Sequence, residues 1–232
     1  MGDRLRLFWA GDHRRDGFLL GAAVGIFGVT FGVLASASGL SAFKATTMSL
    51  LVFTGASQFA AVGIASSGGE PLSALGTALL LAARNGVYSL SIAETLPANG
   101  LKRLIAAQLV IDETAAMSEA QPMPEVSQEV FWVTGISVFV FWNAGTLVGV
   151  FAGQVVGDPL SWGLDAAFPA GFLALLLPHL SDRKKRLAAL LGAVIAAISI
   201  PILPQGLPVL AAAFGAVIAV GVGSKKGKGR HQ

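Results

Sequence analysis

The sequence predicts an all-α protein, a polytopic transmembrane helical bundle of about eight spans. Hydrophobic residues make up 54% of its 232 residues and charged residues only 12%, about half the share that is usual in soluble domains. The mean hydropathy of +0.71 agrees with this composition. A soluble fold of this size would need many more charged side chains to cover its surface, so we expect the chain to lie in a lipid bilayer.

Long stretches without charged residues locate the predicted spans. One of them, Leu187–Ser224, would be about 57 Å long as a single helix, nearly twice the thickness of a bilayer core. Pro201, Pro204 and Pro208 lie near its middle, and because proline interrupts helices we divide this stretch into two spans. The complete set is 18–39, 45–66, 72–96, 101–119, 130–156, 163–180, 187–203 and 206–223. The segment 101–119 is just long enough to cross, which leaves seven spans as the alternative.

Basic residues orient the predicted spans. Clusters of Lys and Arg occur before the first span, between the sixth and seventh, and after the last, and such clusters are typical of the cytoplasmic side. Eight crossings put all three clusters on that side, with a cytoplasmic segment over 1–17, one transmembrane domain over 18–223 and a basic cytoplasmic tail over 224–232. Lys102 and Arg103 then fall on the opposite side, against the rule.

Glycines four residues apart or nearly so mark one face of the first and fifth predicted spans. They are Gly21, Gly25, Gly28 and Gly32 in the first, and Gly145, Gly149, Gly153 and Gly157 in the fifth. Small residues at this spacing let two helix backbones approach closely in lipid, so we predict helix packing at both faces. Similar residues follow each series, Gly39-Leu40-Ser41 and Pro159-Leu160-Ser161, which leaves two repeated halves as an alternative to an unrepeated bundle.

Arg84 is an ionisable residue inside a predicted span. An arginine at mid-membrane is costly unless it faces the bundle or a water-filled cavity. Tyr88 and Ser91 lie four and seven residues later, on the same face of a helix. A guanidinium group there can hold a substrate carboxylate through two parallel hydrogen bonds. The alternative is a structural ion pair with a buried acid.

Asp112 and Glu113 are two adjacent acidic residues inside a predicted span. Adjacent residues on a helix point about 100° apart, so they do not form a catalytic dyad. A carboxyl group inside the membrane can carry a proton, pair with Arg84 or contact a substrate ammonium group. If this end of the segment lies at the membrane surface, both acids are simply solvated.

The run from Thr54 to Gln58 places small and polar residues inside the second predicted span. Gly55 beside Ser57 can open the helix, and backbone groups exposed in this way form ligand sites near the midplane of transporters. The alternative is that Thr54 and Ser57 bond back to the helix and Gln58 bonds to a neighbouring helix. Asn143 is a further amide inside the fifth span, where it can bridge helices or contact a ligand.

Several classes of function are excluded or disfavoured. The chain has no cysteine, which excludes disulfides and thiol nucleophiles. No group of histidines and acids has metal-ligand spacing, and no nucleophile–base pair is evident, so we expect no cofactor and no enzymatic activity. The net charge of +3 belongs mainly to the termini and one loop, a topology signal that gives no indication of nucleic-acid binding.

Together these segments resemble the AzlC-like branched-chain amino acid exporter family over about residues 17–223. The most specific run is Met48–Phe59, which is similar to the family pattern M-S-x-x-V-F-x-G-x-x-Q-F. The other segments that resemble the family are Phe27–Gly32, Arg84 with Tyr88 and Ser91, Asp112-Glu113, Asn143–Gly149 and Asp165–Pro178.

The resemblance implies the large subunit of a secondary transporter in the bacterial cytoplasmic membrane. Such proteins export branched-chain and related apolar amino acids, coupled to protons and together with a small AzlD-like membrane subunit. Arg84 would hold the substrate carboxylate, Asp112 or Glu113 would carry the proton, and the remaining polar contacts would come from Thr54, Ser57, Gln58, Asn85, Tyr88 and Asn143.

Three positions depart from the family pattern. Ala82 and Ile111 stand where the family has Asn and Thr, and Asn85 replaces its usual His, so the substrate range can differ. The alternative function is a non-transporting structural or regulatory subunit of a membrane complex, which the short length of the chain motivates.

Overall fold

The computed structural model describes residues 2–97, 100–156, 173, 177, 180, 183–203, 207–208 and 211–212, and among these it contains helices and no strand. The helices are α1 (Gly2–Ala37), α2 (Ala42–Leu51), α3 (Gly55–Ser66), α4 (Pro71–Ser91), α5 (Gly100–Gln108), α6 (Asp112–Glu119), α7 (Pro124–Val156) and α9 (Arg183–Ser199). The chain divides into two compact units, one of Met1–Gln58 with Ala82–Leu164 and one of Phe59–Leu81 with Asp165–Gln232. The first unit contains all the predicted site residues.

Two helices of the described part are long and apolar enough to cross a membrane, His13–Ala37 within α1 and Pro124–Val155 within α7. The all-α prediction is confirmed for the described residues, but the predicted span over 101–119 is divided into two short helices, and the number of spans stays a prediction. The expected spans at 163–180 and 206–223 lie largely outside the described residues. α1 begins at Gly2, so residues 2–17 continue into the first predicted span as helix.

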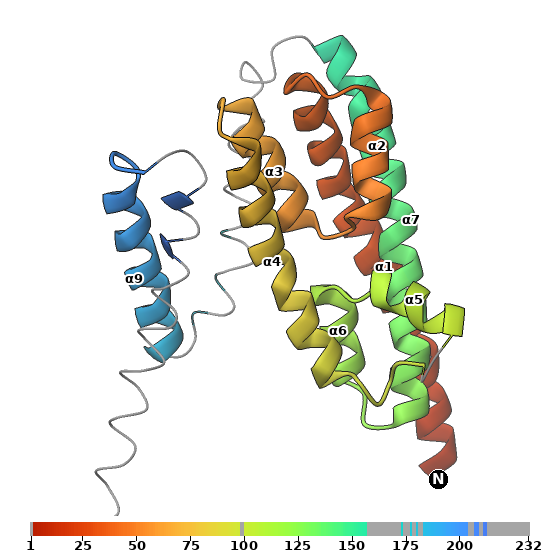
Figure 1. The fold of residues 1–232 in the computed structure, drawn as a ribbon. Helices are drawn as coiled ribbons and strands as arrows, with labels where there is room; N and C mark the ends of the chain where they lie inside the picture. Colours follow the sequence, from red (N-terminus) through yellow and green to blue (C-terminus); the bar gives the residue numbers. More distant parts are fainter. Residues whose placement is uncertain are drawn as a thin grey trace, which may run out of the picture. The chain divides into compact units, whose positions relative to one another are not determined.

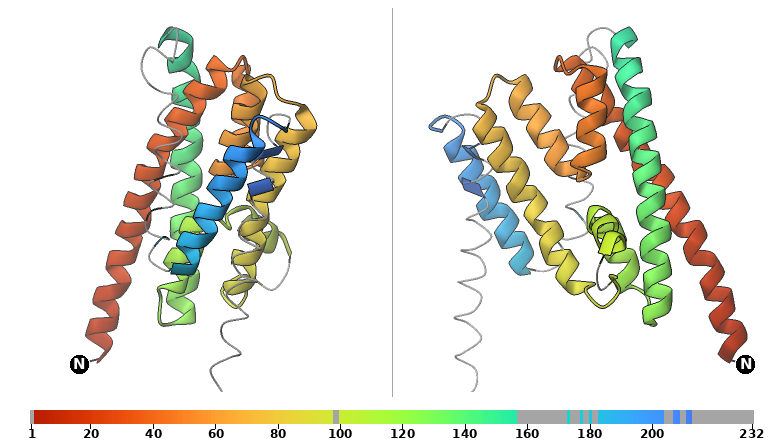
Figure 2. Two further views of the ribbon diagram at one scale, coloured as in Figure 1. Left: turned by 90° about the vertical axis from the view of Figure 1, so that its left-hand side faces the viewer. Right: turned by 45° about the vertical axis from the view of Figure 1, so that its right-hand side comes forward.

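α1 and α7 lie side by side through most of α7 (Figures 1 and 2). The predicted glycine faces meet in this contact. A Cβ atom added to Gly25 would lie 2.9 Å from Cβ of Phe141, and one added to Gly28 would lie 2.5 Å from the Trp142 carbonyl oxygen. Because real Cβ atoms do not approach other atoms so closely, only glycine allows this spacing. The prediction of close helix packing is therefore confirmed.

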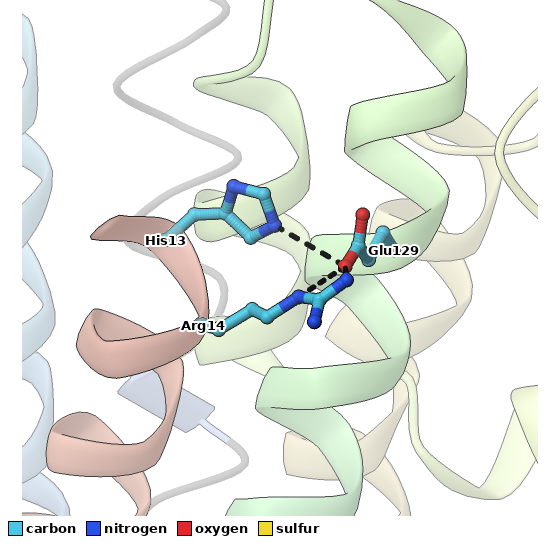
Figure 3. A network of polar contacts seen from close by, with 3 residues as sticks. All are labelled: His13, Arg14 and Glu129. Carbon is cyan, nitrogen blue, oxygen red and sulfur yellow. Dashed lines mark hydrogen bonds and ion pairs between the residues drawn. The ribbon is translucent and has the colours of Figure 1, made fainter. Parts of the chain in front are cut away.

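The contacts along this pair show that α1 and α7 run in the same direction. At one end, Arg14 forms an ion pair with Glu129, and the largely buried His13 lies 3.8 Å from the same carboxylate (Figure 3). At the other end, a Cβ atom added to Gly153 would lie 2.9 Å from Cβ of Ser36. The N-terminal parts of the two helices therefore lie at the same end of the pair.

α2 runs back along the C-terminal half of α7. The hydroxyl of Ser49 donates to that of Thr146 at 3.1 Å, and the ring centroid of Phe53 lies 4.9 Å from that of Phe139. Along α2 and the residues that follow it, later positions thus meet earlier residues of α7. α2 then ends at Leu51, and α3 begins at Gly55.

The α5–α6 segment does not form the single span expected over 101–119. Near its start, the hydroxyl of Thr95 lies 3.0 Å from that of Ser127, and near its end Ser127 donates to the Ser118 carbonyl at 3.0 Å. Between these points the segment reaches Gly135, where an added Cβ atom would lie 3.1 Å from Cβ of Leu109. The segment therefore enters and leaves at the N-terminal end of α7, and the prediction of a crossing helix is wrong.

The reason for this interruption lies in the residues at 109–114. Ile111 has an extended backbone (φ −137°, ψ 174°), so no helix can continue through it. The Thr114 hydroxyl accepts a hydrogen bond from the Ile111 amide at 2.9 Å and donates to the Leu109 carbonyl at 2.8 Å. Asp112 and Glu113 then occupy the first turn of α6, where the helix dipole favours negative charge.

This path also corrects the expected location of Lys102 and Arg103. They lie in the first turn of α5, shortly after Thr95, which contacts the N-terminal end of α7. That end is the one at which Arg14 of α1 pairs with Glu129. The two basic residues thus belong to the same side as the basic N-terminal segment, in agreement with the positive-inside rule.

Single cysteines test this topology, because the chain has none of its own. We expect Lys44→Cys and Lys102→Cys to react with a membrane-impermeant maleimide from opposite sides of the membrane. Lys44 lies in the first turn of α2, toward the C-terminal end of α7, and Lys102 in the first turn of α5. The measurement is labelling of intact cells and of inverted vesicles. Reaction of both thiols from the same side would contradict this topology.

Candidate functional site

Two helix interruptions meet beside the middle third of α7. The first lies between α2 and α3, where Phe53 packs on Phe139 and an added Cβ at Gly55 would lie 2.9 Å from the Trp142 ring. The second lies between α5 and α6, next to Gly135. Residues 135 and 142 are separated by about 10 Å along a helix axis. Non-helical backbone at such a depth in a membrane protein occurs where it lines a cavity or is buried in protein.

Two glutamine side chains satisfy the carbonyl groups at the end of α2. Nε2 of Gln108 donates to the carbonyls of Leu50 and Leu51, at 2.9 and 3.2 Å. Nε2 of Gln58 donates to the Met48 carbonyl at 3.1 Å. The Gln108 amide therefore connects the two interruptions directly.

The helix is opened near the predicted run Thr54–Gln58, but at residues 52–54, because α3 already begins at Gly55, and part of the alternative interpretation holds as well. The Thr54 hydroxyl donates to that of Ser57 at 2.6 Å, so these two side chains bond to each other. The Gln58 side chain is fully buried, and its Oε1 atom has no hydrogen-bond partner among the described residues. A buried acceptor without a donor costs roughly 1–3 kcal/mol, so a further donor at the Gln58 Oε1 atom would be favourable.

An ion pair between α4 and α6 lies beside the second interruption. Nη1 of Arg84 is 2.9 Å from Oδ2 of Asp112, the first residue of α6. Their side chains are 34% and 31% exposed, so solvent or a ligand can reach the pair. Nε of Arg84 is buried and has no partner among the described residues. Of the two interpretations of Arg84, the structural ion pair is present, and the accessible charges leave the ligand-binding one open.

The other predicted polar residues surround these features. Glu113 follows Asp112, and its carboxylate forms no ion pair within the described residues. Tyr88 lies one turn beyond Arg84 on α4 and is half-buried. Oδ1 atoms of Asn85 and Asn143 are buried without a partner in the described part of the chain. Nδ2 of Asn143 donates to the carbonyl of Phe139 within α7 at 2.8 Å, so this donor does not bridge helices.

Sequence reasoning did not select Gln108 and Thr114, which hold the two interruptions in place. Gln108 is an amide in an apolar stretch, four residues before Asp112, and this spacing was the available signal. The same reasoning treated residues 101–119 as one helix, and it therefore predicted no free backbone carbonyl group for Gln108 to bond. Its acceptors are 57 and 58 residues away in sequence, so only the folded chain reveals them.

Comparison with known proteins relates the chain to a group of membrane proteins. A family profile described as "AzlC protein" matches residues 20–156, a range that contains the whole candidate site. An "Uncharacterized membrane protein" of Archaeoglobus fulgidus is 36% identical over 71% of this chain and 73% of its own length. A "Branched-chain amino acid transport protein AzlC" of Bacillus subtilis is 26% identical over 71% of this chain and 65% of its own length. No solved structure matches the chain.

The connection made by Gln108 can be tested by substitution. We expect Gln108→Ala to lower the free energy of unfolding by roughly 1–3 kcal/mol, because the Leu50 and Leu51 carbonyls lose their side-chain donor. Gln121→Ala is the matched control, since that amide bonds only to Met117 in the preceding helical turn. The measurement is thermal or denaturant unfolding in detergent, followed by tryptophan fluorescence. Equal loss of stability in both variants would contradict a special role for Gln108.

Proposed function

Because the chain belongs to the AzlC family, we propose that it is a secondary transporter that exports branched-chain and related apolar amino acids across the bacterial cytoplasmic membrane. We further propose that transport is coupled to protons and that a small AzlD-like membrane subunit takes part. The observation that carries the proposal is the accessible Arg84–Asp112 ion pair beside two helix interruptions.

An amino acid has the charges needed to replace this ion pair. Its carboxylate can accept hydrogen bonds from the Arg84 guanidinium, and its ammonium group can pair with the Asp112 carboxylate. Each protein charge then exchanges one partner for another, so neither is left uncompensated in the membrane. Arg84 Nε, which has no partner among the described residues, adds a donor for the second carboxylate oxygen.

The interruption between α2 and α3 supplies the neutral contacts of the proposed site. Oε1 of Gln58 is a buried acceptor that suits an ammonium donor, and Thr54 and Ser57 add hydroxyl groups. Asn85, Tyr88 and Asn143 complete the set of polar contacts, with Asn143 next to the Trp142 ring that faces Gly55. Helix interruptions of this kind bind the charged groups of substrates and coupling ions in other transporters.

Glu113 is the proposed carrier of the coupling proton. Asp112 already pairs with Arg84, whereas the Glu113 carboxylate forms no ion pair with the described residues. A carboxyl group without a fixed cation can take up and release a proton during the transport cycle, as acidic residues do in other membrane pumps and transporters. Asp112, the other acid of the site, then pairs with the ammonium group of the substrate.

Reversing the ion pair separates substrate binding from a purely structural role. We expect Arg84→Ala to raise the KM for isoleucine exchange in proteoliposomes by at least about tenfold, since it removes a charge-assisted contact. The double variant Arg84→Asp with Asp112→Arg should regain the wild-type melting temperature, because the ion pair is kept. It should not regain isoleucine transport, because the positive and negative charges now face the wrong groups of the substrate. Recovery of isoleucine exchange in this double variant would contradict the proposed substrate contact. Lys44→Ala is the control and should match wild type.

Removing the acid at position 113 tests proton coupling. We expect Glu113→Gln to keep isoleucine exchange within about threefold of wild type while losing transport driven by a pH gradient, because the amide retains the shape but carries no proton. Glu119→Gln is the control, on the last turn of the same helix. The measurement is radiolabelled isoleucine flux with and without the gradient, and unchanged gradient-driven flux would rule out Glu113 as the proton carrier.

A further inference from the structure

A hollow of about 320 Å³ lies between α4 and α5 and is separate from the Arg84–Asp112 pair. Its wall on α4 includes Gly86, Ser89 and Ala93, which lie on the face of the helix opposite Arg84. Neither Arg84 nor Asp112 lines it, and all of its lining residues belong to the first compact unit. The hollow is therefore a candidate site for a ligand other than the transported amino acid.

The charge of the hollow favours an anion. Arg103 is in its wall, and no acidic side chain is among the described residues that line it. Asn85 is also in the wall, and its Nδ2 atom can donate a hydrogen bond. The hydroxyl of Ser89 already donates to the Gly86 carbonyl within α4, at 2.7 Å. A guanidinium group is well suited to the oxygens of a phosphate group, and the amide can add a further donor.

The hollow extends from the basic end of the helices into apolar surroundings. Arg103 lies in the first turn of α5, toward the N-terminal end of α7, and Val110 lies two residues beyond the other end of α5. Leu90 in the wall and Leu104 on α5 are 77% and 70% exposed, and in a membrane such side chains contact lipid chains. The hollow thus combines a cation toward the membrane surface with apolar surroundings that face lipid.

We propose that this hollow binds an anionic phospholipid, with the phosphate group at Arg103 and an acyl chain along the adjoining exposed leucines. Basic pockets between membrane helices bind lipid head groups in this way. A zwitterionic lipid gains less, because its own cation is repelled by the guanidinium group. A soluble phosphate has the same charge as the head group but lacks the acyl chain that the apolar surface favours.

A lipid at Arg103 also holds α5 in place. The opposite end of α5 is Gln108, whose amide donates to the carbonyls of Leu50 and Leu51 at the end of α2. A bound lipid therefore restrains the short helix that connects the two interruptions. Because a ligand that binds only the folded state stabilises it, anionic lipid should raise the melting temperature of the chain.

The first test removes the charge. In detergent micelles with equal amounts of phosphatidylglycerol and phosphatidylcholine, native mass spectrometry gives the ratio of the two bound lipids. We expect Arg103→Gln to lower the ratio of bound phosphatidylglycerol to bound phosphatidylcholine by at least about tenfold, because a charge-assisted contact is lost. Lys102→Gln is the matched control, since Lys102 lies in the same turn but does not line the hollow. At physiological ionic strength, where surface charges are screened, it should stay within about threefold of wild type.

An equal loss of phosphatidylglycerol in Arg103→Gln and Lys102→Gln would indicate general attraction to a basic surface and would overturn the inference. Phosphatidylglycerol should also raise the melting temperature of wild type above its value in phosphatidylcholine, and should not do so in Arg103→Gln. The same rise in both proteins would likewise contradict a site at Arg103.

The second test fills the hollow and leaves Arg103 unchanged. Gly86 is in the wall, and a Cβ atom added to it meets nothing within 4 Å, so a larger side chain fits without displacing the backbone. We expect Gly86→Leu to lose bound phosphatidylglycerol as Arg103→Gln does. Gly63→Leu on α3 is the control, because its surroundings are equally open and it does not line the hollow. Wild-type lipid retention in Gly86→Leu would overturn the inference.

Competition distinguishes a lipid from a soluble anion. Inorganic phosphate and glycerol phosphate, each in large excess over the lipid, should leave the bound phosphatidylglycerol in place, because neither has an acyl chain. Displacement of the lipid by either compound would overturn the lipid assignment in favour of a site for a soluble phosphate.

Discussion

The structure depends on one constraint, that backbone groups in a low-dielectric interior need hydrogen-bond partners even where a helix stops. Two helices stop beside the middle of α7, and side chains complete their hydrogen bonding. Gln58 and Gln108 donate to the last carbonyls of α2, and Thr114 bonds both sides of the gap before α6. Without these three side chains, both interruptions would expose unpaired backbone. With them, the polar groups beside both interruptions are held in place.

The glycine contact between α1 and α7 supplies the frame for these interruptions. Close approach of the two backbones makes α7 a fixed support, and α2 and α6 both lie against it. α2 contacts its C-terminal half and α6 its N-terminal half, so their ends meet near its centre. The Arg84–Asp112 pair is located by this arrangement, since Asp112 begins α6 where the second interruption ends.

Local patterns predicted the parts of the fold that local residues determine. The glycine faces and a helix opening near Thr54 could be predicted from the sequence, and pairing of Arg84 with Asp112 was one of the alternatives. The path of residues 101–119 could not, because hydrophobic length is the same for a crossing helix and for two short helices. Asp112 and Glu113 were the residues from which the start of a second helix could have been predicted, since negative charge is favoured at a helix N-terminus.

The central claim is that this chain moves apolar amino acids through a site built from these interruptions. The most direct measurement is isoleucine flux in proteoliposomes under an imposed pH gradient, with the chain alone and with the proposed small AzlD-like subunit. The account predicts gradient-driven flux in vesicles that contain both proteins. Flux with the chain alone would make the small subunit dispensable, and absence of flux in both preparations, with the protein folded, would contradict the account and favour a non-transporting subunit.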